Sequence, residues 1–210
     1  YRDLEAKYDY IKDVFDTLIV RDIRQKYKIK NVGLMDRLVD FLTDNISNLT
    51  SARNVADTLT ANNDKINHKT IGAYIQYLCN AFAFYKIRRY DIHGKKYLAS
   101  NDKYYLCDHS FRYAKLGTKN LDYGRVLENI VAIELLRRGY EVYVGVLYKK
   151  EIDFVAIKRN EKIYIQVSDN ISDEKTFMRE ATPLLQIKDA YPKMIIARTR
   201  HEEYQYEGIK

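Results

Sequence analysis

The sequence has no tryptophan and only two prolines, eight glycines and two cysteines among its 210 residues. So little glycine and proline excludes collagen-like and low-complexity chains. Cys79 and Cys107 lie in the apolar stretches YLCNAF and YYLCDH without CxxC spacing, which predicts free, buried thiols rather than a disulfide framework or a zinc site. Free thiols favour a reducing compartment, so we expect a cytoplasmic protein.

Long apolar runs and a nucleotide-binding motif are also missing. No stretch approaches the roughly 18 apolar residues that cross a bilayer, and no secretory signal opens the chain, so we expect no membrane span. The pattern GxxxxGK[ST] does not occur, because Gly94-Lys95-Lys96 lacks the upstream glycine. The chain starts at Tyr1 inside a helical pattern, and we expect it to be a fragment of a longer protein.

Aromatic residues and positive charge are abundant. Twenty Tyr and seven Phe, within 46% hydrophobic residues, are enough for real cores without disulfides or metals. The net charge of +7 lies in residues 1–120, which hold 21 Lys/Arg against 14 Asp/Glu, while residues 121–210 hold 15 of each. A basic first part is typical of a module that faces nucleic acid, although mildly basic domains without that role are equally common.

Residues 1–116 are predicted to form helices followed by a hairpin. Apolar residues recur at helical spacing in 4–30 and 34–46, Thr50 or Ser51 begins a short helix, and Asn67 caps the helix HKTIGAYIQYLCNAF. Residues 85–108 form two strands around His93-Gly94. This order predicts a helical linker over residues 1–32 and a winged-helix-like domain over residues 33–116.

A winged helix binds DNA by placing its third helix in the major groove, while its wing contacts phosphates. The nucleic-acid contacts predicted on this basis come from the third helix and the basic hairpin: Lys65, His68, Lys69, Gln76, Arg88, Arg89, Lys95 and Lys96. The alternative is that the same three-helix unit packs against a partner protein.

Residues 117–210 are predicted to form an αβββαβ unit, which makes the whole chain α+β or α/β. The helix 124–140 precedes three strand-like runs, then a helix with a break near Pro183 and the strand MIIA. Glu128 lies in the first helix, and Asp153 and Gln166 lie inside apolar strands. Strand alternation predicts that Ile152 points away from the side of Asp153.

These polar residues predict a site, because a carboxylate among apolar neighbours needs a partner or a metal. Carboxylates on adjacent elements suit a divalent cation, so Glu128 and Asp153 are the candidate ligands of Mg²⁺. The alternatives are a helix-cap role or an ion pair with Lys149 or Lys150 for Asp153, and a surface ion pair with Arg125 for Glu128.

The segments GRVLEN, RRGYEVYVG, EIDFV and YIQV together resemble the PD-(D/E)XK nuclease fold, also known from restriction endonucleases. The resemblance implies a catalytic group of Glu128, Asp153 and Gln166. Where an active enzyme carries Glu-x-Lys, this chain has Gln166-Val167-Ser168. A neutral ligand and a missing cation predict a vestigial or weak site, unless Lys175 or Arg179 replaces the lysine.

Six longer segments resemble the C-terminal half of a family of bacterial and archaeal AAA-type ATPases. They include RDIRQKYKIKN, DKYYLCD, ENIVAIELLRRGYEVYVG and TFMREATPLLQIKDAYPKMII. The resemblance implies that an N-terminal domain, absent here, binds ATP and acts in cis. Where that family commonly has Gly-Leu-Arg, this chain reads HSFRYA at 109–114, which puts any role of that motif in doubt.

The sequence therefore predicts a non-catalytic, DNA-binding module with no cofactor of its own, apart from weak Mg²⁺ binding. Its nuclease-like domain covers residues 117–210. Two alternatives stay open: a Mg²⁺-dependent DNA nuclease, and a protein–protein adaptor that binds no nucleic acid.

Overall fold

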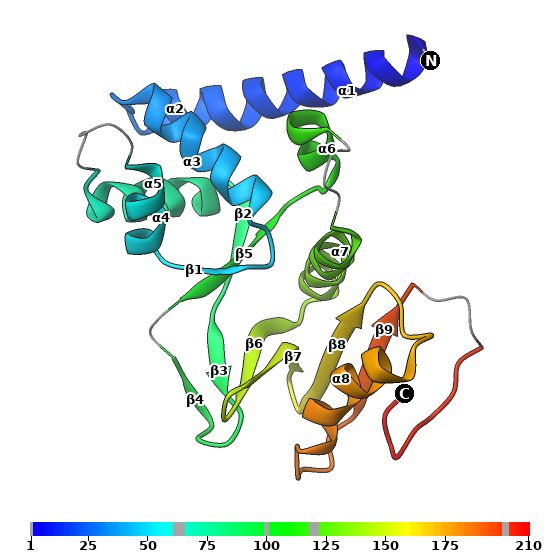
Figure 1. The fold of residues 1–210 in the computed structure, drawn as a ribbon. Helices are drawn as coiled ribbons and strands as arrows, with labels where there is room; N and C mark the ends of the chain where they lie inside the picture. Colours follow the sequence, from blue (N-terminus) through cyan, green and yellow to red (C-terminus); the bar gives the residue numbers. More distant parts are fainter. Residues whose placement is uncertain (1, 61–65, 99–100, 118–121, 199–201) are drawn as a thin grey trace. The chain divides into compact units, whose positions relative to one another are not determined.

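The computed structural model describes residues 2–60, 66–98, 101–117, 122–198 and 202–210 (Figure 1). The chain has a mixed α/β fold and divides into two compact units. One unit holds residues 1–86 and 102–121, and the other holds residues 87–101 and 122–210. Among the described helices, none is both long and apolar enough to cross a membrane.

The first unit combines helices with a small sheet. Its elements in chain order are α1 (Arg2–Val14), the π-helical η1 (Phe15–Arg21), α2 (Asp22–Lys26), α3 (Val32–Asp44), β1 (Leu49–Thr50), α4 (Ala52–Leu59), α5 (His68–Asn80), β2 (Phe84–Ile87), β5 (Asp102–Leu106) and α6 (Ser110–Leu116). The strands lie in the order β1-β5-β2, and β1 pairs with β5 in antiparallel fashion.

Side-chain caps fix where the helices of the first unit begin. Ser51 accepts a hydrogen bond from the backbone N–H of Asn54, and Asn67 accepts one from the N–H of Lys69. These bonds satisfy N–H groups that the helix itself leaves unpaired. They confirm the predicted cap Asn67, and of the two residues predicted for the shorter helix, Thr50 or Ser51, the cap is Ser51. The apolar faces behind them form one core in which Leu38 and Leu78 are fully buried.

The second unit is built around a mixed sheet of six strands. Its elements are β3 (Arg89–Asp91), β4 (Lys96–Tyr97), α7 (Tyr123–Arg137), β6 (Glu141–Leu147), β7 (Lys150–Lys158), β8 (Glu161–Ser168), α8 (Glu174–Leu185) and β9 (Lys193–Ala197). The strand order is β4-β3-β6-β7-β8-β9. Neighbouring strands are antiparallel except for β3–β6 and β8–β9, which are parallel.

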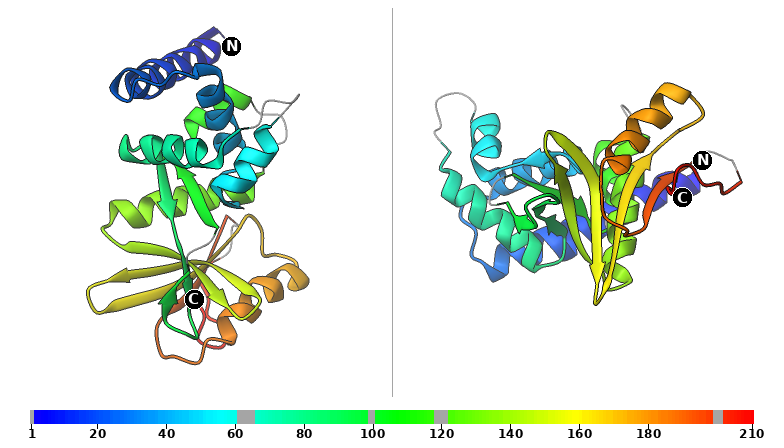
Figure 2. Two further views of the ribbon diagram at one scale, coloured as in Figure 1. Left: turned by 90° about the vertical axis from the view of Figure 1, so that its left-hand side faces the viewer. Right: turned by 90° about the horizontal axis from the view of Figure 1, so that it is seen from below.

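Helices α7 and α8 cover opposite faces of this sheet (Figure 2). On the α8 face, Ala181 and Leu184 pack with Val155 and Tyr164 in one apolar cluster. Because side chains alternate along a strand, Ile165 belongs to the α7 face, where it is buried to 1% exposure. The second unit therefore has a helix on each side of its sheet.

A β-bulge interrupts the pairing of β6 with β7. Tyr143 pairs with Val155 and Gly145 pairs with Ile152, so two residues of β7 oppose one residue of β6. A Cβ at Gly145 would lie 2.8 Å from the Cβ of Ile152 and 2.9 Å from Cγ2 of Val155. Glycine is required here because the side chains of Ile152 and Val155 both pack against the backbone of β6 at Gly145. The bulge breaks the strict alternation, and Ile152 packs with Val155 in the apolar cluster on the α8 face, whereas its orientation relative to Asp153 stays a prediction.

The hairpin predicted as a wing is divided between the two units. Its base, β2 and β5, belongs to the first unit, whereas residues 87–101 belong to the second, where β3 pairs with β6. The excess positive charge is also divided between the two units. The first unit holds 17 Lys/Arg against 13 Asp/Glu and the second holds 19 against 16, so the excess positive charge is not confined to one domain.

Two predicted helices also differ in detail. The stripe over residues 4–30 is three consecutive elements, α1, η1 and α2, rather than one helix. Helix α8 runs through Pro183 and ends at Leu185, so the predicted break is absent. Proline has no N–H to donate to the carbonyl four residues earlier. Pro183 lies in the last turn of α8, where the loss of one backbone hydrogen bond is tolerated. Burial of Pro183 among its neighbours favours the continuous helix.

Candidate functional site

Asp153 and Gln166 hold β7 and β8 together beyond the end of their backbone pairing, which stops at Phe154 and Ile165. The backbone N–H of Asp153 donates to Oε1 of Gln166 at 2.7 Å. The N–H of Val167 donates to Oδ2 of Asp153 at 2.8 Å. Each side chain thus bonds to the opposite strand where the bulge displaces the regular ladder. The structure brings these two predicted residues together.

Glu180 is a member of this site that sequence reasoning missed. The side-chain N–H of Gln166 donates to Oε2 of Glu180 at 3.1 Å, and Arg179 donates to Oε1 of Glu180 from Nε and Nη2 at 3.0 and 2.7 Å. Glu180 is 8% exposed and Gln166 is 6% exposed. The missed signal is the acidic residue on the buried side of α8, since a buried carboxylate requires a donor.

This bonding engages several of the oxygen atoms that could bind a cation. The Gln166 oxygen already accepts from a backbone N–H, and Arg179 neutralises Glu180. Ser168, which stands where the resemblance expects lysine, donates its hydroxyl to the carbonyl of Asn170 at 3.2 Å. Among the described residues, no three His, Cys, Asp or Glu side chains are placed to hold a metal ion. Asp153, Gln166, Glu180 and Arg179 are thus joined in one hydrogen-bond network.

Glu128 and the basic residues of α8 complete the predicted group. Glu128 is half-buried in α7, and it takes part in interactions of its own. Its convergence with Asp153 and Gln166 stays a prediction, as does a metal site formed by Glu128 and Asp153. Arg179 bonds Glu180, and Lys175 is exposed near the start of α8.

Three of the predicted nucleic-acid contacts lie exposed on α5. They are His68 and Lys69 at its N-terminus and Gln76, whose amide donates to Asn80 at 2.8 Å. Arg53 of α4, which sequence reasoning did not select, lines with His68 a hollow of about 390 Å³. Lys65 lies outside the described residues.

The remaining predicted contacts belong to the second unit. Arg88 is exposed, and its guanidinium lies 5.1 Å from the ring centre of Tyr97. Arg89 is half-buried in β3, beside β6. Lys95 and Lys96 are exposed at the tip of the β3–β4 hairpin. They are therefore edge residues of the six-stranded sheet, not a wing of the first unit.

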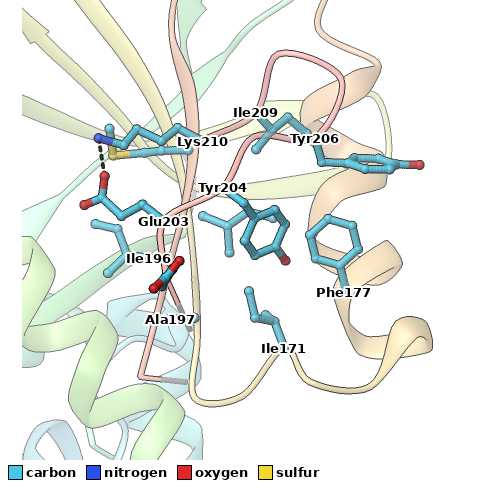
Figure 3. Close-up of a pocket in the computed structure, with 12 residues that line it drawn as sticks. Ile171, Phe177, Ile196, Ala197, Glu203, Tyr204, Tyr206, Ile209 and Lys210 are labelled. Atoms are coloured by element: carbon cyan, nitrogen blue, oxygen red, sulfur yellow. Dashed lines mark ion pairs between the residues drawn. The ribbon is translucent and has the colours of Figure 1, made fainter. Parts of the chain in front are cut away.

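The second unit also has an apolar pocket of about 360 Å³ along β9 (Figure 3). Its walls come from β9, from the start of α8 and from the C-terminal segment, and they include Ile171, Phe177, Ile196, Tyr204 and Tyr206. The rings of Phe177 and Tyr206 meet edge to face at 5.1 Å. An ion pair between Glu203 and Lys210 at 2.8 Å crosses one side of the pocket.

Comparison with known proteins places the chain in a family. The model of the family described as "Domain of unknown function (DUF8612)" matches residues 1–122, more than half of the chain. The chain belongs to this family. The DUF8612 match contains the whole first unit together with residues 87–101 of the second unit, and it ends where α7 begins.

Two curated relatives extend beyond the DUF8612 region. An uncharacterized protein of Haemophilus influenzae is 39% identical over 208 residues, which are 99% of this chain and 51% of the relative. The uncharacterized protein MJ1544 of Methanocaldococcus jannaschii is 27% identical over 175 residues, 81% of this chain and 38% of that protein. The chain thus spans about half of one of these curated relatives and 38% of the other. No solved structure matches it significantly.

Proposed function

We propose that this chain is a nucleic-acid-binding module of an AAA-type ATPase, with α5 as the helix that contacts duplex DNA. The order α3-β1-α4-α5-β2-β5, with β5 between the other two strands, supports a winged-helix arrangement of the first unit. The exposed face of α5 carries the proposal, because His68, Lys69 and Gln76 lie open to solvent on it. Arg53 beside His68 adds a cation near the same helix end.

The second unit is, in this proposal, a nuclease-like domain that has lost its metal chemistry. Its order α7-β6-β7-β8-α8-β9 supports the resemblance to PD-(D/E)XK enzymes. The bonds joining Asp153, Gln166 and Glu180 support the loss, because they engage Oδ2 of Asp153 and the side-chain oxygen of Gln166. The relatives are about two or more times longer than this chain, which leaves room for an ATPase domain in cis.

A salt-dependent titration tests the DNA-binding proposal. Fluorescence anisotropy of a labelled 20-base-pair duplex should show binding whose log–log salt slope is about −0.9 per phosphate contacted. Lys69→Ala combined with Gln76→Ala should weaken binding by about tenfold or more, because one good base contact contributes about 1–3 kcal/mol. Lys12→Ala, an exposed lysine of α1, is the control and should change little. A duplex that does not bind at low salt would favour a protein adaptor.

A further inference from the structure

Two hairpin tips of the second unit lie side by side at one end of its sheet. Because β3 runs parallel to β6, the β3–β4 turn and the β6–β7 turn emerge at the same end. The N–H of Ile92 donates to the carbonyl of Val146 at 2.9 Å, and the rings of His93 and Tyr148 lie 5.3 Å apart. Residues 93–96 and 148–150 are called the paired tips below.

The paired tips concentrate positive charge. Each contributes two lysines: Lys95 and Lys96 from one, and Lys149 and Lys150 from the other. All are exposed except Lys150, which is half-buried, and none of the four forms an ion pair within the described part of the chain. The carboxylate of Asp91 is engaged, since one oxygen accepts from the N–H groups of His93 and Gly94 at 3.1 Å each.

An exposed aromatic ring accompanies this charge. Tyr148 is 71% exposed and has a φ of +56°, a conformation that favours glycine or asparagine. Turn geometry therefore does not explain a tyrosine at this position, and most of Tyr148 stays exposed although its ring contacts His93. Proteins bind single-stranded nucleic acid with aromatic rings flanked by cationic side chains. The bases stack on the rings, and the phosphates lie near the cations.

We infer that the paired tips are a second nucleic-acid contact, which binds single-stranded nucleic acid through Lys95, Lys96, Lys149 and Lys150 and stacks a base on Tyr148. The inference rests on the proposed function and adds to it a site in the other unit and a class of ligand. Nucleic acid fits better than a lipid surface, because the tips present tyrosine and lysine and no exposed aliphatic side chain.

The test is anisotropy of a fluorescein-labelled 20-nucleotide oligo(dT) over a salt series. Lys95→Gln with Lys149→Gln should lower the affinity at least tenfold at low salt and reduce the log–log slope by about 1.4, since each lost phosphate contact contributes about 0.7. Tyr148→Ala should lower the affinity about tenfold and leave the slope unchanged, whereas Tyr148→Phe keeps the ring and should bind like the original.

The matched control removes equal charge elsewhere in the second unit. Arg159→Gln with Lys188→Gln changes two exposed cations, one of them in the β7–β8 turn at the other end of β7. Equal losses in both double variants, or an unchanged slope for the tip variant, would overturn the inference. So would binding to phosphatidylserine vesicles without binding to oligo(dT).

The α5 variant separates this inference from the proposed function. If Lys69→Ala with Gln76→Ala weakens duplex binding while the tip variants leave oligo(dT) binding intact, the inference fails and the proposed function stands. If only the tip variants lose binding, the inference stands and the role of α5 fails.

Discussion

Asp153 and Gln166 exchange hydrogen bonds across two strands. The Asp153 N–H donates to the Gln166 side chain, and the carboxylate of Asp153 accepts from the residue that follows Gln166. The pair closes the gap that the β7 bulge opens, and Gln166 links it to Glu180 on α8. The nuclease resemblance makes Gln166 a degenerate metal ligand. In the structure Gln166 is the centre of a buried network, because its neutral side-chain amide both donates and accepts a hydrogen bond.

Gln166→Glu should destabilise the protein increasingly as pH rises. The new carboxyl would be buried beside Glu180, so its pKa in the folded state should exceed the unfolded value of about 4.3. A raised pKa means that stability is lost as pH rises from the unfolded value through the folded one. Urea unfolding should show a small loss at pH 4 and one of about 1–3 kcal/mol at pH 8.

Gln166→Leu is the control for this effect. It removes the same hydrogen bonds without adding charge, so its loss of stability should be similar at both pH values. If the stability of Gln166→Glu and that of Gln166→Leu depend on pH in the same way, Glu180 does not repel the carboxyl introduced at position 166. That outcome would contradict the proposed network.

Mg²⁺ should bind weakly or not at all, and DNA should remain uncleaved. Titration calorimetry with millimolar Mg²⁺ should give no saturable heat, because Gln166 is neutral and Arg179 neutralises Glu180. Asp153→Asn keeps an oxygen that can accept from Val167 and should behave like the original in both assays. Mg²⁺-dependent cleavage that disappears in Asp153→Asn would instead establish the nuclease alternative.

Gly145→Ala should destabilise the second unit by about 1–3 kcal/mol, because the added methyl would overlap Ile152 and Val155 in a packed core. Gly33→Ala is the matched control. Its Cβ would come no nearer than 4.0 Å to another side chain, and it lies in a helix, where alanine is favoured by about 0.5–1 kcal/mol. Thermal unfolding of both variants measures this difference in stability. Equal changes in melting temperature would show that the bulge has room for the added methyl group.

Local signals in the sequence were sufficient for much of the fold. Asn67 caps the helix that it was predicted to cap, and Ser51, one of the two residues predicted for the shorter helix, caps α4, since capping depends on residues three or fewer positions apart. The resemblance to PD-(D/E)XK nucleases implied that Asp153 and Gln166 lie together on neighbouring strands, and the structure joins them by a hydrogen bond.

Long-range pairing could not be predicted in this way. Nothing near Tyr90 specifies that β3 pairs with β6, more than fifty residues later, rather than staying with the sheet of the first unit. The bulge at Asp153 depends on how Gly145 packs against Ile92, Ile152 and Val155, which is a tertiary contact. Glu180 was missed for the same reason, since its partner Gln166 lies on another element.

The two cysteines should react slowly in the folded protein. Burial raises the pKa of both Cys79 and Cys107 from 9.0 to about 11, so each is a neutral thiol at pH 8, and the thiolate is the reactive form. Reaction with Ellman's reagent at pH 8 should be slow and become fast in 6 M guanidinium. The raised pKa also implies that stability falls as pH rises from about 9 towards 11. A rapid reaction of either thiol in the native state, assigned with Cys79→Ala, would contradict this burial.

Removing the C-terminal segment should destabilise the second unit and expose a sheet edge. Lys210 adds to the outer side of β9, with its N–H donating to the carbonyl of Lys193 and its carbonyl accepting from the N–H of Ile195. Ile209 is 3% exposed within the same cluster as Leu184, and burying such a side chain contributes about 1.5–3 kcal/mol. Deletion of residues 204–210 should therefore lower the stability by at least that amount.

The deletion should also cause self-association, because an uncovered edge strand offers unpaired N–H and C=O groups to another copy. Light scattering coupled to size-exclusion chromatography measures this, and thermal unfolding measures the stability. Glu203→Gln is the control, since it removes an ion pair whose side chains are 81% and 64% exposed and should change the stability by less than about 1 kcal/mol. If the deletion is as stable and as monomeric as the Glu203→Gln variant, the segment does not protect the edge of β9.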